Sequence, residues 1–342
     1  MAASTASLRT ADRALPRLVL IGTGGTIAGK GESAVNTSTY DCSVLRVDEI
    51  LANLPTAACV AHIRTEQLFQ IGSENFANDH LLTLGRRVAA LLSDDNVDGV
   101  VITHGTDTID ETAYFLHLTI KSTKPVVVVG AMRPPSALSA DGPLNLYNAI
   151  VVAASPDAHG KGTLVVTNDE IHTARDVVKS NTFKQEAFRS PYGPLGYIVE
   201  GVPRFYRLTA RSHTVNSEWS IDCIHSLPEV GIVYAHSGMT DATVHALLDS
   251  GVSAIIYAAT GNGNVADRVV GALVEARRRG VHVIRASRTG GGVVLRNGSQ
   301  PDDRYDWVVA DVQVPHKARI LAMLALTCSG DSARLQHAFM SY

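Results

Sequence analysis

Two threonines of this 342-residue sequence lie in glycine-flanked segments that directly follow predicted strands, where a ligand could bind. Thr26 lies in the glycine-rich residues 22–31, and Thr106 lies in His104-Gly105-Thr106-Asp107-Thr108. A threonine hydroxyl is a weak nucleophile that a nearby base can activate, and backbone N–H groups of glycine turns can stabilise an oxyanion. The backbone N–H groups at the helix start beside Thr106 could therefore receive an oxyanion or a carboxylate. Taken alone, residues 22–31 are explained equally well as a tight strand exit with an incidental threonine.

Asp107 and Lys179 are the charged groups that could assist such a reaction. Asp107 precedes Thr108-x-x-Glu111, which predicts a capping box and the start of a helix. A carboxylate beside that helix end could bind a substrate ammonium group. Lys179 follows a predicted strand in a polar stretch and could move a proton. On spacing alone, a solvated surface lysine is the better interpretation of Lys179.

The glycine-rich turn also suggests nucleotide binding. Gly24, Gly29 and Lys30 fit GxxxxGK, but Gly31 stands where a serine or threonine would hold magnesium. The dinucleotide pattern GxGxxG fails at Ile27. Residues 31–40 are small and polar, so no helix is expected where a phosphate cradle needs one. A mobile lid is the favoured interpretation of this segment, and a nucleotide-binding protein remains an alternative.

Short β-branched runs alternate with helix-compatible segments, which predicts a parallel sheet covered by helices on both faces. Strands are expected at residues 18–21, 97–103, 125–129, 164–167, 231–234, 254–258 and 282–286, and helices at 80–92, 112–120, 243–248 and 265–279. Ligands bind beyond the carboxyl ends of such strands, where Thr26 and Thr106 lie. The length favours two domains. We predict a larger N-terminal doubly wound, flavodoxin-like domain (1–208), a polar linker (209–228) and a smaller C-terminal α/β domain (229–342).

Composition and charge exclude several classes of protein. Apolar residues make up 45% and charged residues 18%, as in globular chains, and the net charge of −3 gives no footprint for nucleic acid. The four cysteines lack CxxC spacing and the histidines lack HExxH spacing, so neither a disulfide framework nor a metal site is indicated. Residues 1–16 lack an apolar signal core, and no membrane span is expected. We expect a cytoplasmic chain, or a periplasmic or secreted one if a signal peptide has been removed.

Several motifs in order along the chain resemble the bacterial-type asparaginase family. The resemblance runs from about Leu18 to the C-terminus and is carried by Thr23-Gly24-Gly25-Thr26-Ile27-Ala28-Gly29, by His104-Gly105-Thr106-Asp107-Thr108 and by residues 130–149. Two further motifs, Tyr192-Gly193-Pro194-Leu195-Gly196-Tyr197 and Gly261-Asn262-Gly263-Asn264, resemble the type II branch of that family.

The resemblance implies hydrolysis of L-asparagine to L-aspartate and ammonia through a threonine acyl-enzyme, without metal or organic cofactor. Glutamine is expected to be a weaker substrate. The implied nucleophile is Thr26, and the other implied catalytic residues are Tyr40, Thr106, Asp107 and Lys179. The implied substrate-binding residues are Gly25, Ser73, Glu74, Gly105, Thr106, Asp107, Ala131 and Asn264.

The resemblance also implies a homotetramer in which Asn264 completes the active site of a neighbouring subunit. The sequence departs from the family in two places. Many members carry a glutamate in the loop before Asp302, whereas residues 298–301 read Gly-Ser-Gln-Pro. The family's disulfide has no counterpart, because no cysteine lies between Cys59 and Cys223. A non-catalytic amino-acid sensor that binds asparagine or aspartate through Ser73 and Asp107 is a further alternative.

Overall fold

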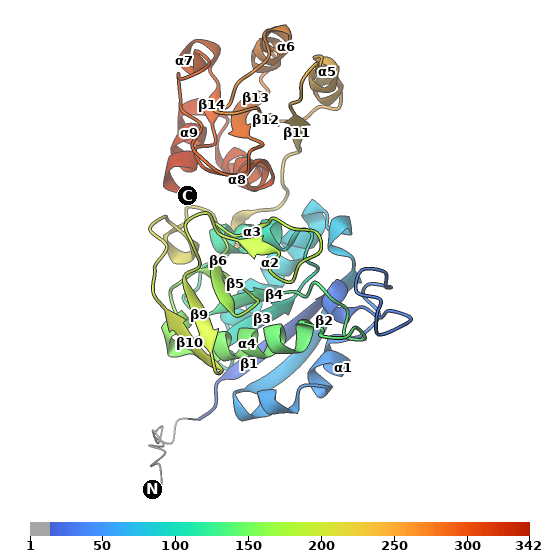
Figure 1. Cartoon of the computed structure of the whole chain (residues 1–342). Helices are drawn as coiled ribbons and strands as arrows, with labels where there is room; N and C mark the ends of the chain where they lie inside the picture. Colours follow the sequence, from blue (N-terminus) through green and yellow to red (C-terminus); the bar gives the residue numbers. More distant parts are fainter. Residues whose placement is uncertain (1–13) are drawn as a thin grey trace, which may run out of the picture.

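The computed structural model describes residues 14–342. It contains two large sheets joined by one long connection, and a separate two-stranded sheet (Figure 1). The prediction about a signal sequence falls mostly on residues 1–13, outside the described residues. Within residues 14–342, no helix is both long and apolar enough to cross a membrane.

The N-terminal sheet has eight strands in the order β10-β9-β6-β5-β4-β3-β1-β2. Its parallel part is formed by β1 (Arg17–Gly24), β2 (His62–Ile71), β3 (Gly99–Thr103), β4 (Val126–Val129) and β5 (Thr163–Thr167). The antiparallel extension is formed by β6 (Glu170–Thr173), β9 (Gly196–Val199) and β10 (Val202–Phe205). The parallel order 2-1-3-4-5 is that of a flavodoxin-like sheet, which confirms the predicted fold class.

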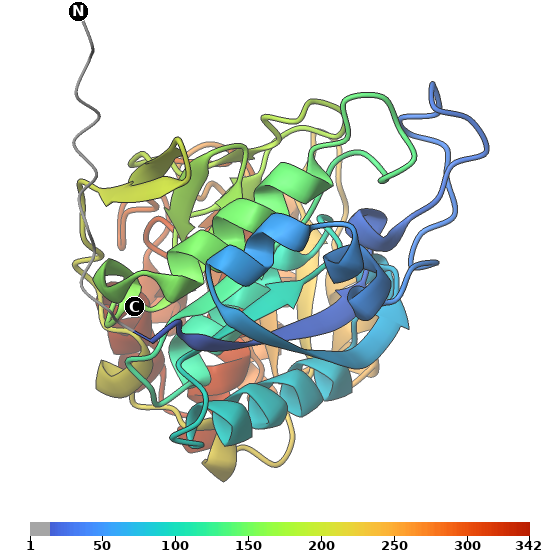
Figure 2. The same ribbon diagram turned by 90° about the horizontal axis from the view of Figure 1, so that it is seen from below.

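Successive side chains of β1 point to opposite faces of the sheet, so alternate residues pack into two separate apolar cores. Val19 and Ile21 pack with α2 (Asn78–Leu92) and α3 (Ile109–Thr119) on one face of the sheet. Leu18 and Leu20 pack with α4 (Gly142–Ala154) on the other face, where α1 (Val47–Ala52) also lies (Figure 2). Helices therefore cover both faces, as the pattern of strands and helices predicts.

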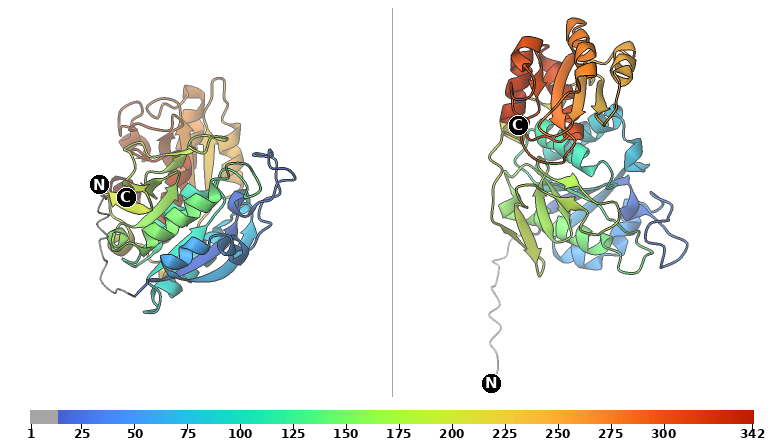
Figure 3. Two further views of the ribbon diagram at one scale, coloured as in Figure 1. Left: turned by 60° about the horizontal axis from the view of Figure 1, so that its bottom comes forward. Right: turned by 45° about the horizontal axis from the view of Figure 1, so that its top comes forward.

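The C-terminal sheet is parallel and smaller. It contains β11 (Val230–Tyr234), β12 (Ala254–Ala259), β13 (His282–Ser287) and β14 (Val308–Val309), in that order. Its helices are α5 (Ala242–Asp249), α6 (Asp267–Arg278), α7 (Asp302–Tyr305), α8 (Pro315–Cys328) and α9 (Ser332–Ser341). Helix α8 packs on α3, so the apolar core continues from one sheet domain into the other (Figures 1 and 3).

The connection between the two large sheets packs against the rest of the protein. After β10, residues 206–229 cross to β11 with only short 3-10 turns, and Trp219, Ile221 and Ile224 in this segment are buried. The predicted linker boundaries at residues 209 and 228 stay a prediction. A short hairpin of β7 (Val178–Lys179) and β8 (Phe188–Arg189) leaves the N-terminal domain and becomes important at the candidate site.

Candidate active site

Thr26 and Thr106 follow two neighbouring strands, β1 and β3, at the point where the strand order of the sheet reverses. The residues before them touch: a Cβ added to Gly25 would lie 2.2 Å from Gly105 Cα. Gly25 also has φ 83°, a conformation that side-chain-bearing residues rarely adopt. The structure therefore brings the two predicted threonine turns together, at the edge where open α/β sheets bind ligands.

Thr26 is hydrogen-bonded to Tyr40, another residue that the resemblance implies is catalytic. Thr26 begins a single 3-10 turn (Thr26–Ala28), is 8% exposed, and its Oγ1 lies 2.7 Å from the Tyr40 hydroxyl. Burial raises the pKa of Tyr40, although the hydrogen bond to Thr26 opposes the shift. Tyr40 is therefore protonated at neutral pH, so it acts on Thr26 as a neutral hydrogen-bonding group.

Tyr40 lies near the end of the polar segment 30–41, which we call the lid. Two backbone hydrogen bonds between Lys30 and Asp41 (2.8 and 3.0 Å) close its base, and the lid extends away from the sheet (Figure 3). The residues after the glycine turn form this loop, and the next α-helix begins only at Val47. The helix N-terminus that a nucleotide phosphate would need is therefore absent from the described residues at this position.

Lys179 joins Thr106 and Asp107 into one polar group. Its Nζ donates to Thr106 Oγ1 (2.8 Å) and to Asp107 Oδ1 (2.6 Å). The Lys179 side chain is 17% exposed, whereas that of Asp107 is 61% exposed. Because the ammonium already occupies one lone pair of Thr106 Oγ1, the Thr106 hydroxyl hydrogen is available to another acceptor. The interpretation of Lys179 as a solvated surface residue is therefore wrong.

Ser73 lies behind the Gly105 turn and replaces the predicted capping box. Its Oγ accepts the Asp107 N–H (3.2 Å), and its carbonyl accepts the Thr108 hydroxyl (2.8 Å). Thr108 is the N-cap of α3, but its side chain makes no cap hydrogen bond, and the Glu111 N–H bonds Asp110 Oδ1 instead (3.0 Å). The predicted Thr108–Glu111 capping box is wrong, because the Ser73 carbonyl takes the hydroxyl.

Glu74 and Ala131 border the same place. Glu74 is the exposed neighbour of Ser73, and its carboxylate accepts a hydrogen bond from Asn75 (3.0 Å). Ala131 is buried beyond β4, next to Gly130, whose added Cβ would meet Thr106 Cγ2 at 2.9 Å. Ala131 thus lies near Thr106 and Glu74 next to Ser73; their roles in substrate binding stay predictions.

Asn264 does not join the other predicted site residues. It lies after β12 in the C-terminal domain, and its N–H donates to Thr260 (2.9 Å). The loop 298–301 is close to it, with Ser299 Oγ 3.4 Å from the carbonyls of Asn262 and Gly263. The buried Arg285 holds this loop through Ser299 (3.2 Å) and an ion pair with Asp302 (2.6 Å). Within residues 14–342, no recorded hydrogen bond links Asn264 to the threonine pair.

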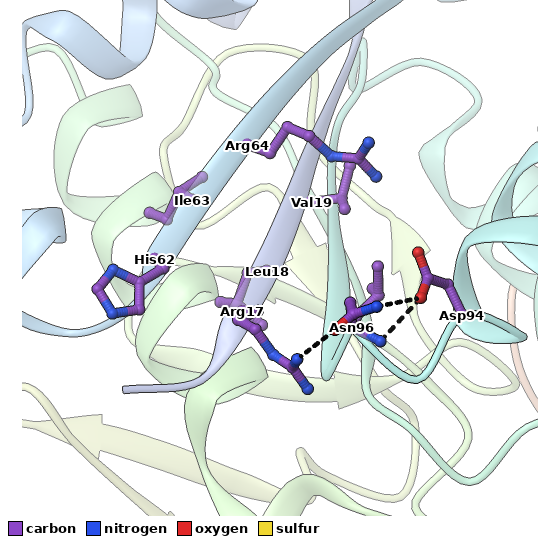
Figure 4. Close-up of a pocket in the computed structure, with 9 residues that line it drawn as sticks. Arg17, Leu18, Val19, His62, Ile63, Arg64, Asp94 and Asn96 are labelled. Atoms are coloured by element: carbon purple, nitrogen blue, oxygen red, sulfur yellow. Dashed lines mark hydrogen bonds between the residues drawn. The ribbon is translucent and has the colours of Figure 1, made fainter. Parts of the chain in front are cut away.

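Two cavities of similar volume lie in different parts of the protein, and one of them is lined by a predicted catalytic residue. One of about 340 Å³ lies at the amino ends of β1 and β2, the edge of the sheet opposite Thr26, with Arg17, His62 and Arg64 in its lining (Figure 4). A second of about 340 Å³ is lined by Lys179 and His316 between the β7–β8 hairpin and the C-terminal domain. No cluster of His, Cys, Asp or Glu in residues 14–342 is arranged to hold a metal ion. The expectation of a cofactor-free reaction stays a prediction.

Two supporting residues were missed from the sequence. Ser43 Oγ accepts the Gly25 N–H (2.8 Å), so in this arrangement that N–H is not free for the predicted oxyanion role. His104 is fully buried against Phe76, with ring centroids 4.5 Å apart, and its Nδ1 donates to the Gly105 carbonyl (2.7 Å). In the sequence, the only signal for His104 is its position directly before Gly105.

The buried His104 is expected to make stability depend on pH. Burial lowers the pKa of His104 to about 4 from the ordinary 6.5. The unfolded chain takes up this proton first, so the free energy of unfolding should fall as the pH drops from 6.5 towards 4, by up to about 3 kcal/mol. Urea unfolding of His104→Asn across this range should show a shallower fall than the parent, whereas exposed His62→Asn should not. If the free energy of unfolding falls equally steeply with pH in the parent and in His104→Asn, the buried His104 is not the cause of the pH dependence.

Comparison with known proteins follows the same division into two domains. A family model described as Asparaginase, N-terminal matches residues 17–211, and a model described as Glutaminase/Asparaginase C-terminal domain matches residues 229–339. The chain belongs to the asparaginase family. The predicted resemblance is therefore confirmed.

Relatives of this asparaginase-family chain carry two kinds of name. It is 54% identical to a glutaminase-asparaginase of Pseudomonas fluorescens biotype A, over 96% of this chain and 91% of that protein. It is 42% identical to L-asparaginase 2 of Escherichia coli strain K12, over 96% and 94%. A crystal structure of a probable cytoplasmic L-asparaginase from Campylobacter jejuni superposes with a TM-score of 0.93 at 41% identity, covering 96% of this chain and all of that one.

Proposed function

We propose that this chain is an amidohydrolase that converts L-asparagine to L-aspartate and ammonia, with Thr26 as nucleophile. The observation that carries the proposal is the pair of threonines on touching turns, each bonded to a different polar partner. Thr26 has Tyr40 at 2.7 Å, and Thr106 has Lys179 at 2.8 Å. Family membership and the names of the relatives support the same activity.

The geometry suits a two-step reaction. Thr26 Oγ1 bonds to the amide carbon, the carbon–nitrogen bond breaks, and water later cleaves the ester and restores the hydroxyl. The first step moves one proton, net, from the Thr26 hydroxyl to the nitrogen that leaves as ammonia. Tyr40 is positioned to accept the Thr26 proton while its own hydroxyl proton passes to water. The Lys179 ammonium is positioned to supply a proton to the leaving nitrogen through Thr106, and water then returns one to Lys179.

The amino-acid end of the substrate is assigned to the second turn. Asp107 is exposed and carries a carboxylate for the substrate ammonium group, while Ser73 and Glu74 lie beside it. Neither alternative to catalysis gains support. A sensor needs no hydrogen-bonded threonine nucleophile, and a nucleotide site lacks its helix after Gly29.

A homotetramer with shared active sites is part of the proposal. Its support is that Asn264 and the loop 298–301 lie together on the C-terminal domain, bonded within that domain rather than to the threonines of the same chain. Sedimentation velocity tests the assembly. The predicted cytoplasmic location also stays a prediction, since one relative is named a probable periplasmic enzyme and the matched structure a probable cytoplasmic one. Cell fractionation checks it.

Ammonia release from asparagine and from glutamine tests the function and its specificity together. One methylene in a pocket gives only about 10- to 200-fold discrimination. Because residues 298–301 lack an acid, we predict that the site closes less readily over the longer side chain. The kcat/KM for asparagine should exceed that for glutamine by about tenfold or more. The relatives named glutaminase-asparaginase make glutamine the necessary comparison. Equal efficiency on both amides would refute the preference, and no release from either would refute the function.

Placing a glutamate in that loop extends the test. Ser299→Glu and Gln300→Glu should change kcat more than KM, because the added acid would act on proton transfer and lid closure. Gln300 makes only a long contact with the Val265 carbonyl (3.5 Å), whereas Ser299 bonds Arg285 (3.2 Å). The two variants therefore place the added carboxylate in different surroundings. Unaltered kinetics in both variants would mean that the loop does not reach an active site.

A further inference from the structure

The first turn of α8 belongs to the C-terminal domain but contacts the segment that leads into the strand carrying Lys179. Helix α8 packs against α3, the helix that follows the Thr106 turn. Its second and third residues, His316 and Lys317, face the N-terminal domain through separate hydrogen bonds. The proposed catalytic site does not use either residue directly.

Lys317 fixes the chain just before Lys179. The side chain of Lys317 is fully buried, and its Nζ donates to the carbonyls of Ala174 (2.8 Å), Arg175 (3.1 Å) and Val177. A lysine ammonium has three donors, so these carbonyls satisfy it completely. The segment that leads into β7 is therefore held by a side chain from the other domain.

His316 fixes Lys179 itself through Asp110. His316 Nε2 lies 3.1 Å from Asp110 Oδ2, and the same oxygen accepts the backbone N–H of Lys179 (3.3 Å). Asp110 is 3% exposed, and its Oδ1 accepts the Glu111 N–H (3.0 Å). Asp110 thus connects α3, α8 and β7 in the interior of the protein.

The charges around this junction support one another. Burial opposes ionisation of Asp110, but the hydrogen bond from His316 and the nearby Lys317 hold its pKa below the ordinary value. Burial lowers the pKa of Lys317 to about 8, with the carboxylates of Asp110 and Asp176 favouring its charged form. At neutral pH both groups are therefore ionised. Removing either one leaves the other buried with less compensation, which is costly.

We propose that the first turn of α8 is the support that positions Lys179 for catalysis, with His316 acting through Asp110 and Lys317 through the carbonyls before β7. The inference rests on the proposed role of Lys179. The Lys179 side chain reaches Thr106 and Asp107 only if the Lys179 backbone is held in its present position relative to α3. Misplacement of a catalytic group by about 1 Å can cost about 100-fold in rate.

The test compares kcat, KM and thermal stability in four variants. His316→Leu removes the donor to Asp110, and His316→Gln retains an amide donor. Lys317→Met removes the buried ammonium. Lys124→Met is the matched control, because Lys124 Nζ also donates to two backbone carbonyls, those of Leu92 (2.8 Å) and Asp94 (2.9 Å), outside the candidate site.

We expect His316→Leu and Lys317→Met to lower kcat at least tenfold with KM within about twofold of the parent. His316→Gln should recover kcat to within about threefold, and Lys124→Met should leave it unchanged. If His316→Leu and Lys317→Met lose thermal stability but keep the parent kcat, the contacts only stabilise the fold and the proposal is overturned. An equal loss of kcat in Lys124→Met would overturn it as well.

A labelling measurement separates this inference from the proposed function. Acetic anhydride modification followed by mass spectrometry compares Lys179 with exposed Lys184 in the same hairpin. Lys179 should react several times faster in His316→Leu than in the parent, relative to Lys184. If the parent releases no ammonia, the proposed function fails while labelling still tests the positioning. If the parent is active and Lys179 labelling is the same in His316→Leu, the positioning fails alone.

Discussion

Thr26→Val is expected to lower kcat for asparagine by about 10³-fold or more while leaving the protein folded and able to bind aspartate. Valine has nearly the shape of threonine, so the 3-10 turn and the Gly25–Gly105 contact should survive. What is lost is the hydroxyl bonded to Tyr40, and with it the covalent route. Ammonia release and aspartate binding by calorimetry measure the two properties separately.

The glycine turn itself offers the matched control. Thr23 is buried three residues earlier, and its hydroxyl donates to the Thr103 carbonyl (2.8 Å). Thr23→Val should cost about 1 kcal/mol of stability and leave kcat within a few-fold of the parent. If Thr26→Val retained turnover within about tenfold of the parent, Thr26 would not be the nucleophile.

Lys179→Met should have the second-largest effect, a fall in kcat of about 10²- to 10⁴-fold with a much smaller change in KM. Methionine keeps most of the apolar stem but removes the donor shared by Thr106 Oγ1 and Asp107 Oδ1. Thr106 then has no cation from which to draw the proton for the leaving nitrogen. Steady-state kinetics from pH 5 to about 10 would show both the size of the loss and any change in pH dependence.

Lys184→Met is the control for this variant, because Lys184 is exposed in the same hairpin. Full activity of Lys179→Met, with a pH–rate profile that superimposes on that of the parent, would remove Lys179 from the mechanism. A rise in KM with kcat unchanged would assign Lys179 to substrate binding instead.

The parallel sheet could be predicted because its strands are apolar on both faces. The strands expected from residues 18–21 and 125–129, for example, became β1 and β4 with ends shifted by a few residues. β2 was missed because His62–Ile71 is an edge strand whose residues are mostly half-buried and include Arg64, Glu66 and Gln70. α8 was missed because eight of its fourteen residues are buried, so its helical polar stripe is weak.

The candidate site also contains some residues whose positions could be predicted from the sequence and others whose positions could not. Thr26 and Thr106 could be found because each follows a predictable strand and needs only its neighbouring glycine. The position of Lys179 could not be predicted from its spacing, because it depends on the β7–β8 hairpin and on Asp110, 69 residues earlier. The expected capping box failed for a related reason: the Ser73 carbonyl, 35 residues away, competes for the Thr108 hydroxyl.

The contact between Gly25 and Gly105 bears on how this enzyme could be re-engineered. The backbones of Gly25 and Gly105 are in direct contact, which leaves no room for a Cβ. The distance between the two reactive hydroxyls is therefore set by backbone contact and does not depend on a side chain that mutation could enlarge or shorten. Substrate range and catalytic geometry are thereby uncoupled. Libraries that vary Glu74, the lid residues other than Tyr40, or the loop 298–301 should yield new amide preferences with Thr26 and Thr106 still in place. Alanine at either glycine should instead abolish turnover for every amide at once.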